Sequence, residues 1–196
     1  MLERCSNLES SNVIDDLVTR RSSQNLGLAF FYFDYKSPDA QKPTEVVKSL
    51  IRQLADRVAD LTNTELEILF CKYRSHESAP ELSELLICLD SLPRYFDSTF
   101  IILDALDEIV SKERAALVDA LAKCSRTSIK VLATSRPDLS DVEDLFKRIN
   151  AEKLEIRSDT EDIKNYLKEK IPHATDSPFL RDRIKESLTT NDGNCL

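Results

Sequence analysis

The sequence has few of the residues on which several common kinds of functional site depend. Its 196 residues include only 2 glycines and 2 histidines, and no tryptophan. A membrane-spanning helix needs roughly 18 or more consecutive apolar residues, and the chain has no such run. The residues after Met1 also lack the pattern of a signal peptide. We therefore expect a protein without a membrane segment.

Positive charge is also in deficit. The chain has 27 Lys and Arg against 35 Asp and Glu, which gives a formal charge of −8. A general nucleic-acid binder usually carries a basic stripe, so this charge balance argues against a nucleic-acid partner. It does not exclude a nucleotide pocket, which needs only a few local residues.

Cysteine and histidine are too scattered to form a metal or disulfide framework. The five cysteines stand at positions 5, 71, 88, 124 and 195, with no Cys-x-x-Cys pair, and His76 and His173 are isolated. An odd, dispersed set of this kind predicts neither a zinc site nor a disulfide scaffold. Reduced thiols are typical of the cytosol, so we expect a cytoplasmic protein.

Apolar runs alternate with segments of helical periodicity along the chain. Runs at 26–33, 100–104 and 129–134 predict strands, and a shorter alternating run at 154–157 predicts a fourth. Helical periodicity predicts a helix over 8–20 and a short helix around Leu66, Leu69 and Phe70. The other predicted helices have starts that we place at Thr44, Ser78, Ser111 and Ser158. Strands that alternate with helices predict an α/β fold with a parallel sheet.

The most informative stretch is 100–108, where four apolar residues lead directly into acids. Asp104, Asp107 and Glu108 fall at or just beyond the end of the predicted strand. Open α/β sheets bind ligands at the carboxyl ends of their strands, where carboxylates can hold a metal ion and handle a water molecule. The alternative is a buried strand followed by an acidic helix start, since acids favour a helix N-terminus. The stretch alone leaves both interpretations open.

A second candidate follows the predicted strand 129–134. The residues Thr134-Ser135-Arg136-Pro137 end that strand, and an Arg fork binds phosphate oxygens while staying charged. The alternative is an ordinary strand exit with a solvated Arg136 and a proline that stops the strand. The position of this segment, one strand–helix unit after the acids, favours the functional interpretation.

Together the two segments resemble the NACHT family of P-loop nucleotidases, within the STAND class of signalling ATPases. Asp104-Ala105-Leu106-Asp107-Glu108 resembles its Walker B segment, and Thr134-Ser135-Arg136-Pro137 resembles its sensor 1 segment. The resemblance covers roughly residues 8 to 190 and is closest to fungal modules of the nephrocystin-3-type N-terminal domain, which commonly precede ankyrin or WD repeats.

The resemblance implies roles for the site residues and a cofactor, Mg·ATP or Mg·GTP. Asp104 would hold Mg²⁺, usually through water, and Asp107 and Glu108 would help the metal or orient the attacking water. Thr134, Ser135 and Arg136 would face the γ-phosphate.

The resemblance also implies an architecture. We expect a three-layer, P-loop NTPase-like parallel sheet with 26–33, 100–104 and 129–134 adjacent in that order. The phosphate-loop strand, which in the family lies between 129–134 and 154–157, is missing, so we expect a gap or a poor direct pairing there. Residues 1–158 would form the partial core, and 159–196 the start of a helical lid and a disordered tail.

The sequence departs from the family at the phosphate loop. The family's Gly-x-x-x-x-Gly-Lys-[Ser/Thr] motif, whose amides and lysine hold the phosphates, occurs nowhere, and Gly27 and Gly193 have the wrong neighbours. The register of the following helix places Cys5-Ser6-Asn7 where Gly-Lys-[Ser/Thr] should stand. We therefore expect a module cut at its phosphate loop, either a truncated gene product or the result of a misplaced start codon.

Three functions remain. The first is a degenerate nucleotide-binding and oligomerisation switch that binds ATP weakly or not at all. The second is a non-nucleotide interaction scaffold, and the last is an active Mg-ATPase, against which the missing lysine counts strongly. We expect no turnover, and partners that are other protein chains: a STAND oligomer, or effector and repeat domains of the same protein. We also expect the uncovered edge of 129–134 to make the isolated chain poorly soluble or partly molten.

Overall fold

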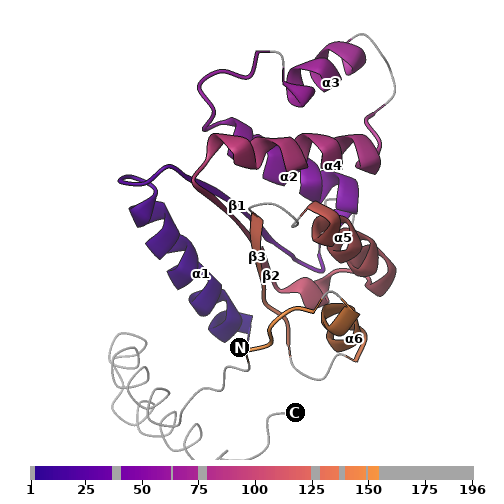
Figure 1. The fold of residues 1–196 in the computed structure, drawn as a ribbon. Coiled ribbons are helices and arrows are strands. Elements are labelled where there is room, and N and C mark those ends of the chain that lie inside the picture. The colour runs from indigo at the N-terminus through magenta and orange to yellow at the C-terminus, as the bar shows by residue number, and fades with distance from the viewer. Residues whose placement is uncertain are drawn as a thin grey trace, which may run out of the picture. The chain divides into compact units, whose positions relative to one another are not determined.

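The computed structural model describes residues 3–36, 41–62, 64–74, 79–124, 129–136, 140–148 and 150–154. The chain divides into two units, Met1–Ala151 and Glu152–Leu196, and the first contains every helix and strand of the described residues. These elements in order (Figure 1) are α1 (Glu3–Arg20), β1 (Leu26–Tyr32), α2 (Pro43–Ala55), α3 (Glu65–Tyr73), α4 (Leu82–Ser91), the 3₁₀ turn η2 (Leu92–Tyr95), β2 (Ser98–Asp104), the 3₁₀ turn η3 (Leu106–Glu108), α5 (Ser111–Cys124), β3 (Ile129–Ala133) and α6 (Ser140–Arg148).

The three strands form a parallel sheet in the order β1-β2-β3. The register pairs Tyr32 with Asp104 and Leu103 with Ala133, so all three strands end at the same edge. The α/β class and the predicted order of these strands, with 100–104 in the centre, are confirmed.

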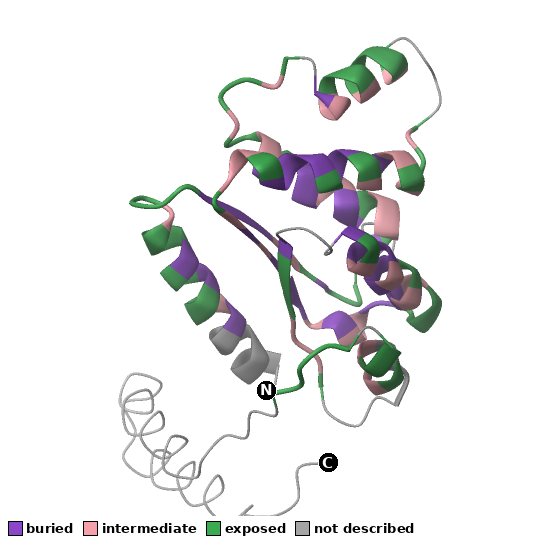
Figure 2. Cartoon of the chain, viewed as in Figure 1, coloured by how far each residue is buried: buried purple, intermediate pink, exposed green. Residues whose placement is uncertain are grey.

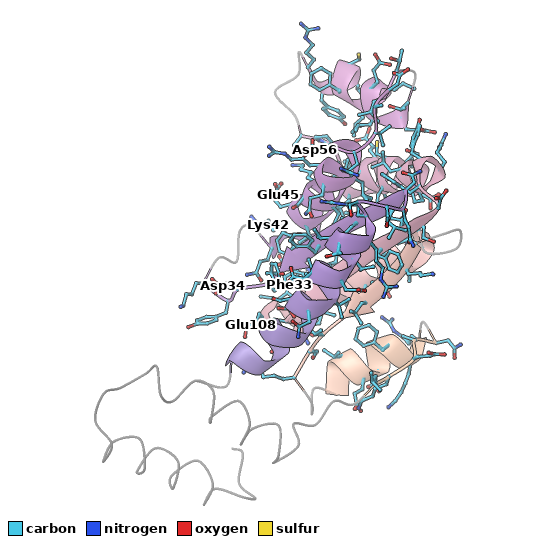
Figure 3. All side chains as sticks on the ribbon, turned by 90° about the vertical axis from the view of Figure 1, so that its left-hand side faces the viewer. Phe33, Asp34, Lys42, Glu45, Asp56 and Glu108 are labelled. Carbon is cyan, nitrogen blue, oxygen red and sulfur yellow. The ribbon has the colours of Figure 1, made fainter. Side chains whose placement is uncertain are left out.

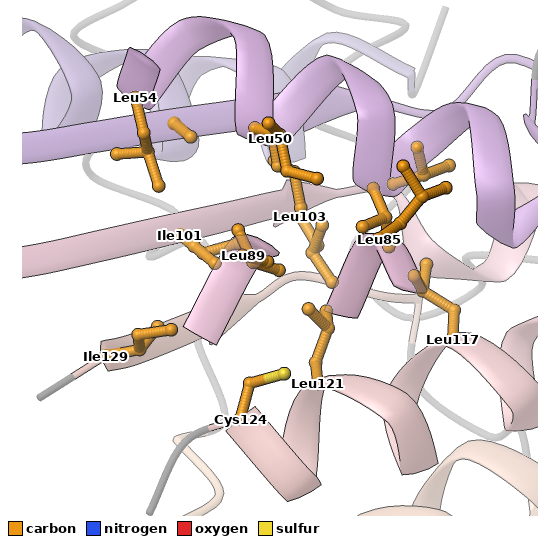
Figure 4. Packing of buried hydrophobic residues seen from close by; sticks show 14 of the residues in the cluster. Leu50, Leu54, Leu85, Leu89, Ile101, Leu103, Leu117, Leu121, Cys124 and Ile129 are labelled. Atoms are coloured by element: carbon orange, nitrogen blue, oxygen red, sulfur yellow. The ribbon is translucent and has the colours of Figure 1, made fainter. Parts of the chain in front are cut away.

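Alternate residues of the strands point to opposite faces of the sheet, as the pleat requires. Ala29, Ile101 and Leu103 enter a large core shared with apolar residues of α2, α4 and α5, which Figure 4 shows converging on β2. Leu28 and Ile102 enter a smaller cluster with Ile14 and Leu17 of α1. Burial on both faces explains why β1 and β2 are largely continuous apolar runs rather than alternating ones.

Two predicted helix starts were wrong, and proline explains both. α2 begins at Pro43 with Lys42 in the cap position rather than Thr44, because proline is preorganised for the first helical position. α4 begins at Leu82, and Glu84 Oε2 accepts a hydrogen bond from the Glu81 backbone N–H at 3.0 Å. The predicted start at Ser78 would place Ala79 in a helix directly before Pro80, where helical conformation is disfavoured.

α1 begins earlier than the periodicity predicted. The expected helix over 8–20 extends back to Glu3, so Cys5-Ser6-Asn7 lie within α1. None of the helices in the described part of the chain has the length and hydropathy of a membrane span.

Some expectations fall largely on residues outside the described ranges. Leu154 of the predicted strand 154–157 is not in a strand and is 83% exposed, and the rest of that strand lies outside the described residues. The helix start at Ser158 and the expected lid and tail over 159–196 also lie outside them.

The two edges of the sheet differ. At β1, the Gln53 side chain from α2 accepts from the Phe30 N–H at 3.1 Å and donates to the Phe30 carbonyl at 2.8 Å, which satisfies outward-facing backbone groups. At β3, Val131 and Leu132 are each 42% exposed although they point to opposite faces, and within the described ranges β3 is the last strand of the sheet.

Candidate functional site

The site lies at the carboxyl ends of β2 and β3, where the register brings two polar residues together. Leu103 pairs with Ala133, so Asp104 and Thr134 follow side by side. The Thr134 hydroxyl donates to Asp104 Oδ1 at 2.6 Å. The end of β1 lies at the same edge, because the Phe33 N–H donates to the Asp104 carbonyl at 3.0 Å. Figure 3 labels Phe33 and Glu108 at this end of the molecule.

Asp104 is a buried acid with one oxygen unused. The residue is 1% exposed, and its Oδ2 has no hydrogen-bond partner among the described residues. Buried polar atoms are nearly always paired, because an unpaired one has lost its hydration without compensation. An orphaned carboxylate oxygen of this kind is a suitable ligand for a cation or a cation-bound water.

The chain turns sharply after Asp104. Ala105 has φ 57° and ψ 50°, the left-handed conformation, which costs a residue with a Cβ roughly 1–2 kcal/mol. Thr134 holds this turn from the neighbouring strand: its hydroxyl accepts from the Ala105 N–H at 3.0 Å and its carbonyl accepts from the Leu106 N–H at 2.8 Å. The turn leads directly into η3, which carries Asp107 and Glu108.

Arg136 joins the two acids of η3. Its Nε donates to Asp107 Oδ2 at 2.5 Å and its guanidinium NH2 to Glu108 Oε1 at 2.8 Å, and its backbone N–H donates to Asp107 Oδ1 at 3.2 Å. The two carboxylates are almost enclosed, with side-chain exposures of 5% and 15%, whereas the arginine side chain is 69% exposed. Arg136 therefore closes over the acids from the solvent side.

The structure thus places the residues that the sequence had singled out at one sheet edge, in two hydrogen-bonded groups: Asp104 with Thr134, and Asp107 and Glu108 with Arg136. Ser135 is adjacent, but its hydroxyl donates to the Arg136 carbonyl at 3.0 Å and not to an acid. The left-handed Ala105 and the double use of the Thr134 hydroxyl were not anticipated. The only feature of the sequence that could have indicated them is that Thr134, a hydroxyl residue, comes into register with Asp104, the acid that ends the central strand.

The fit to Mg²⁺ can be judged from the donor set. Mg²⁺ is usually bound through one or two carboxylates, with water and substrate phosphates filling its shell. Asp104 Oδ2 can supply one such contact, and no three metal-ligating side chains converge among the described residues. The residues present therefore fit a metal whose other ligands are water and phosphate. Three carboxylates against one guanidinium also give the site a formal excess of negative charge.

A separate groove lies between α2, α3 and α4. It has a volume of about 690 Å³, and its walls include Ile51, Leu66, Phe70 and Leu85. None of the residues at the sheet edge lines it.

Comparison with protein families supports a family assignment. The model of the nephrocystin 3 N-terminal family matches residues 8–136, a stretch that holds all three strands and every candidate site residue. No curated protein and no solved structure matches the chain. Because the matched stretch covers well over half of the 196 residues, the chain belongs to the nephrocystin 3 N-terminal family.

Proposed function

We propose that the chain is part of a nucleotide-dependent signalling switch of the NACHT type, carrying its metal-binding and phosphate-sensing residues. The observation that supports this proposal best is that Asp104 ends the central strand at the carboxyl edge of a parallel sheet, with the ion pairs of Arg136 to Asp107 and Glu108 just beyond it. That edge is where open α/β sheets bind ligands.

Each residue has a role in this proposal. Asp104 would hold Mg²⁺ through its free oxygen, and Asp107 and Glu108 would orient the metal or a water molecule. The bound metal would supply positive charge against the phosphate oxygens of ATP or GTP. Arg136 would add a second positive charge once it leaves the two acids.

We further propose that this chain by itself binds nucleotide weakly or not at all. Phosphoryl transfer and triphosphate binding depend mainly on positioning and charge neutralisation. The sequence contains no Gly-x-x-x-x-Gly-Lys-[Ser/Thr] motif. Losing several charge-assisted contacts of roughly 1.5–3 kcal/mol each weakens binding by at least about a thousandfold relative to a complete site.

Isothermal titration with Mg·ATP and Mg·GTP tests this proposal. We expect no saturable binding at micromolar concentrations and no phosphate release above background. The matched variants are Asp104→Ala at the site and Asp119→Ala at an exposed ion pair on α5. A micromolar dissociation constant that disappears only in Asp104→Ala would mean that nucleotide binds by another route, and the proposal of weak binding would then fail.

A second candidate is a protein-interaction scaffold in which the acids have lost their function. The observation in its favour is that Arg136 already neutralises Asp107 and Glu108 without any ligand, as a structural ion-pair network does. Millimolar Mg·ATP distinguishes a weakly binding switch from the scaffold, because a ligand that binds only the folded state raises its melting temperature. A rise that Asp104→Ala removes supports a switch that still binds nucleotide weakly, whereas no rise is expected both of the scaffold and of a switch that binds none. In both cases the proposed partners are other protein chains in the cytoplasm.

A further inference from the structure

We infer that Thr134 is a positioning residue for Asp104, and that it fixes which carboxylate oxygen is offered to a divalent cation. This inference rests on the proposed function and assigns Thr134 a task different from contact with a phosphate. It follows from the hydrogen bonds at one hydroxyl group.

A threonine hydroxyl has one proton to donate and can also accept hydrogen bonds. Oγ1 of Thr134 accepts from the Ala105 backbone N–H at 3.0 Å, and an amide nitrogen can only donate in such a bond. The single hydroxyl proton therefore goes to Asp104 Oδ1 at 2.6 Å. While both bonds persist, the hydroxyl has no proton left for a phosphate oxygen.

The consequence for Asp104 is a fixed orientation of its carboxylate. Oδ1 is held by Thr134, and Oδ2 is the oxygen that remains buried without a partner among the described residues. The two oxygens of a carboxylate are equivalent, so a half-turn restores the same arrangement. Any other orientation would break the bond to Thr134 at a residue that is only 1% exposed to water. Oδ2 is therefore the oxygen presented to a cation.

Thr134 is itself held firmly enough for this task. Its backbone N–H donates to the Leu103 carbonyl at 2.9 Å, and its carbonyl accepts from the Leu106 N–H at 2.8 Å. Its β-branched side chain has restricted freedom about χ1. Outer hydrogen bonds of this type orient metal-binding carboxylates, and their loss typically weakens metal binding roughly 10–100-fold.

The test uses the 196-residue chain, labelled with ¹⁵N, and Mn²⁺ alone as the probe. Paramagnetic broadening of the amide signals of residues 104–106 reports binding beside Asp104. In the wild-type chain we expect broadening that saturates at millimolar Mn²⁺ and is absent in Asp104→Asn. We expect Thr134→Val and Thr134→Ala to weaken it by roughly tenfold or more, and Thr134→Ser, which keeps the hydroxyl, to restore it.

Two controls separate positioning from a general loss of structure. Thr99→Val removes another buried hydroxyl from the same strand pair, one whose Oγ1 has no partner among the described residues, and should leave Mn²⁺ binding unchanged. The Leu106 amide bonds to the Thr134 backbone carbonyl, so it should stay protected from hydrogen exchange in Thr134→Val while the Ala105 amide loses protection.

Three results would overturn the inference. These are a wild-type chain with no saturable broadening near Asp104, a Thr134→Val chain that binds Mn²⁺ as tightly as the wild type, and a Thr134→Ser chain that fails to restore binding. No nucleotide enters this experiment, so its failure is distinct from a failure of the proposed nucleotide switch.

Discussion

Arg136 balances the charge of the site from within the chain. A carboxylate as enclosed as that of Asp107, with 5% of its side chain exposed, is stable as an ion only when it is paired and hydrogen-bonded. Arg136 provides two of these hydrogen bonds to Asp107 and a third to Glu108. Arg136 therefore already has anionic partners, and under the proposed function a nucleotide phosphate would have to compete with them.

Removing this arginine should destabilise the fold. In Arg136→Gln we expect the free energy of unfolding to fall by about 1–3 kcal/mol, because two nearly enclosed acids lose a charged donor. Urea denaturation at neutral pH measures the change. The matched control is Arg148→Gln, whose ion pair with Asp119 is 58% and 46% exposed and should contribute no more than about 1 kcal/mol. Equal losses in the two variants would contradict the prediction.

At this scale the sequence identified the residues but not their pairing. Asp104, Asp107 and Glu108 could be selected because carboxylates directly after a buried strand have few structural uses, and Arg136 because its segment follows the acids one strand–helix unit later. Which donor meets which acceptor depends on the register of β2 against β3 and on the left-handed turn at Ala105. An alanine in that conformation gives no local signal, because a tertiary contact from Thr134 maintains it.

Among the elements, α3 is attached to the domain without a single buried residue. Its Leu66 and Leu69 are only partly buried against the core, and Figure 2 shows the helix mostly exposed beside the buried stretches of α2 and α4. Glu84 of α4 accepts two hydrogen bonds from α3: the Lys72 ammonium donates to Oε1 at 2.5 Å and the Tyr73 hydroxyl to Oε2 at 2.6 Å. These hydrogen bonds, with Lys72 the larger cause and Tyr73 the next, lower the pKa of Glu84 to about 2.

This pKa predicts that α3 loosens in acid. A carboxyl group with a lowered pKa in the folded state stabilises that state when ionised. The contribution of Glu84 is therefore complete above its ordinary pKa of 4.5 and is lost as the pH falls toward about 2. Hydrogen exchange of the α3 amides, followed from pH 6 downward, should accelerate relative to the amides of β2.

Glu84→Gln tests the cause of that pH dependence. This variant removes the ionisable group. The amide hydrogens of α3 should therefore exchange faster than in the wild type at pH 6, and lowering the pH further should accelerate their exchange much less. Glu45→Gln, which breaks an exposed ion pair with Lys48 on α2, should leave the α3 profile unchanged. Acid loosening of α3 that persists in Glu84→Gln would assign the effect to another group.

The elements differ in how far the sequence predicted them. β1 and β2 were predictable because burial on both faces leaves largely continuous apolar runs, and β3 because its residues are mostly β-branched or apolar around Lys130 although the strand is mostly exposed. The existence of α3 was also predictable from Leu66, Leu69 and Phe70. Its hydrogen bonds to α4 were not, because nothing in the sequence indicates that Lys72 and Glu84 lie next to each other. The starts of α2 and α4 were misplaced because neighbouring prolines, rather than the nearest hydroxyl residues, determine them.

For the whole molecule, we expect the contrast between the two sheet edges to govern self-association in solution. The Phe30 backbone of β1 is satisfied by Gln53, a contact that nothing in the sequence indicated. The expected exposure along 129–134 agrees with the 42% exposure of both Val131 and Leu132 on β3. An apolar strand at the end of a sheet favours pairing with other chains, and natural proteins often place a lysine there to prevent it.

Leu132→Lys should therefore reduce self-association. We expect the wild-type chain to associate and to bind a dye for apolar surface, and the variant to do less of both without a lower urea midpoint, because Leu132 is only partly buried. Sedimentation velocity and dye fluorescence measure these effects.

The control is Ile68→Lys on α3, where the isoleucine is 64% exposed but is not on a strand. If exposed apolar area alone drove association, Ile68→Lys would be at least as effective; if the strand edge drives it, only Leu132→Lys will act. A wild-type chain that stays monomeric, melts sharply and binds no dye would show that the β3 edge is covered in solution.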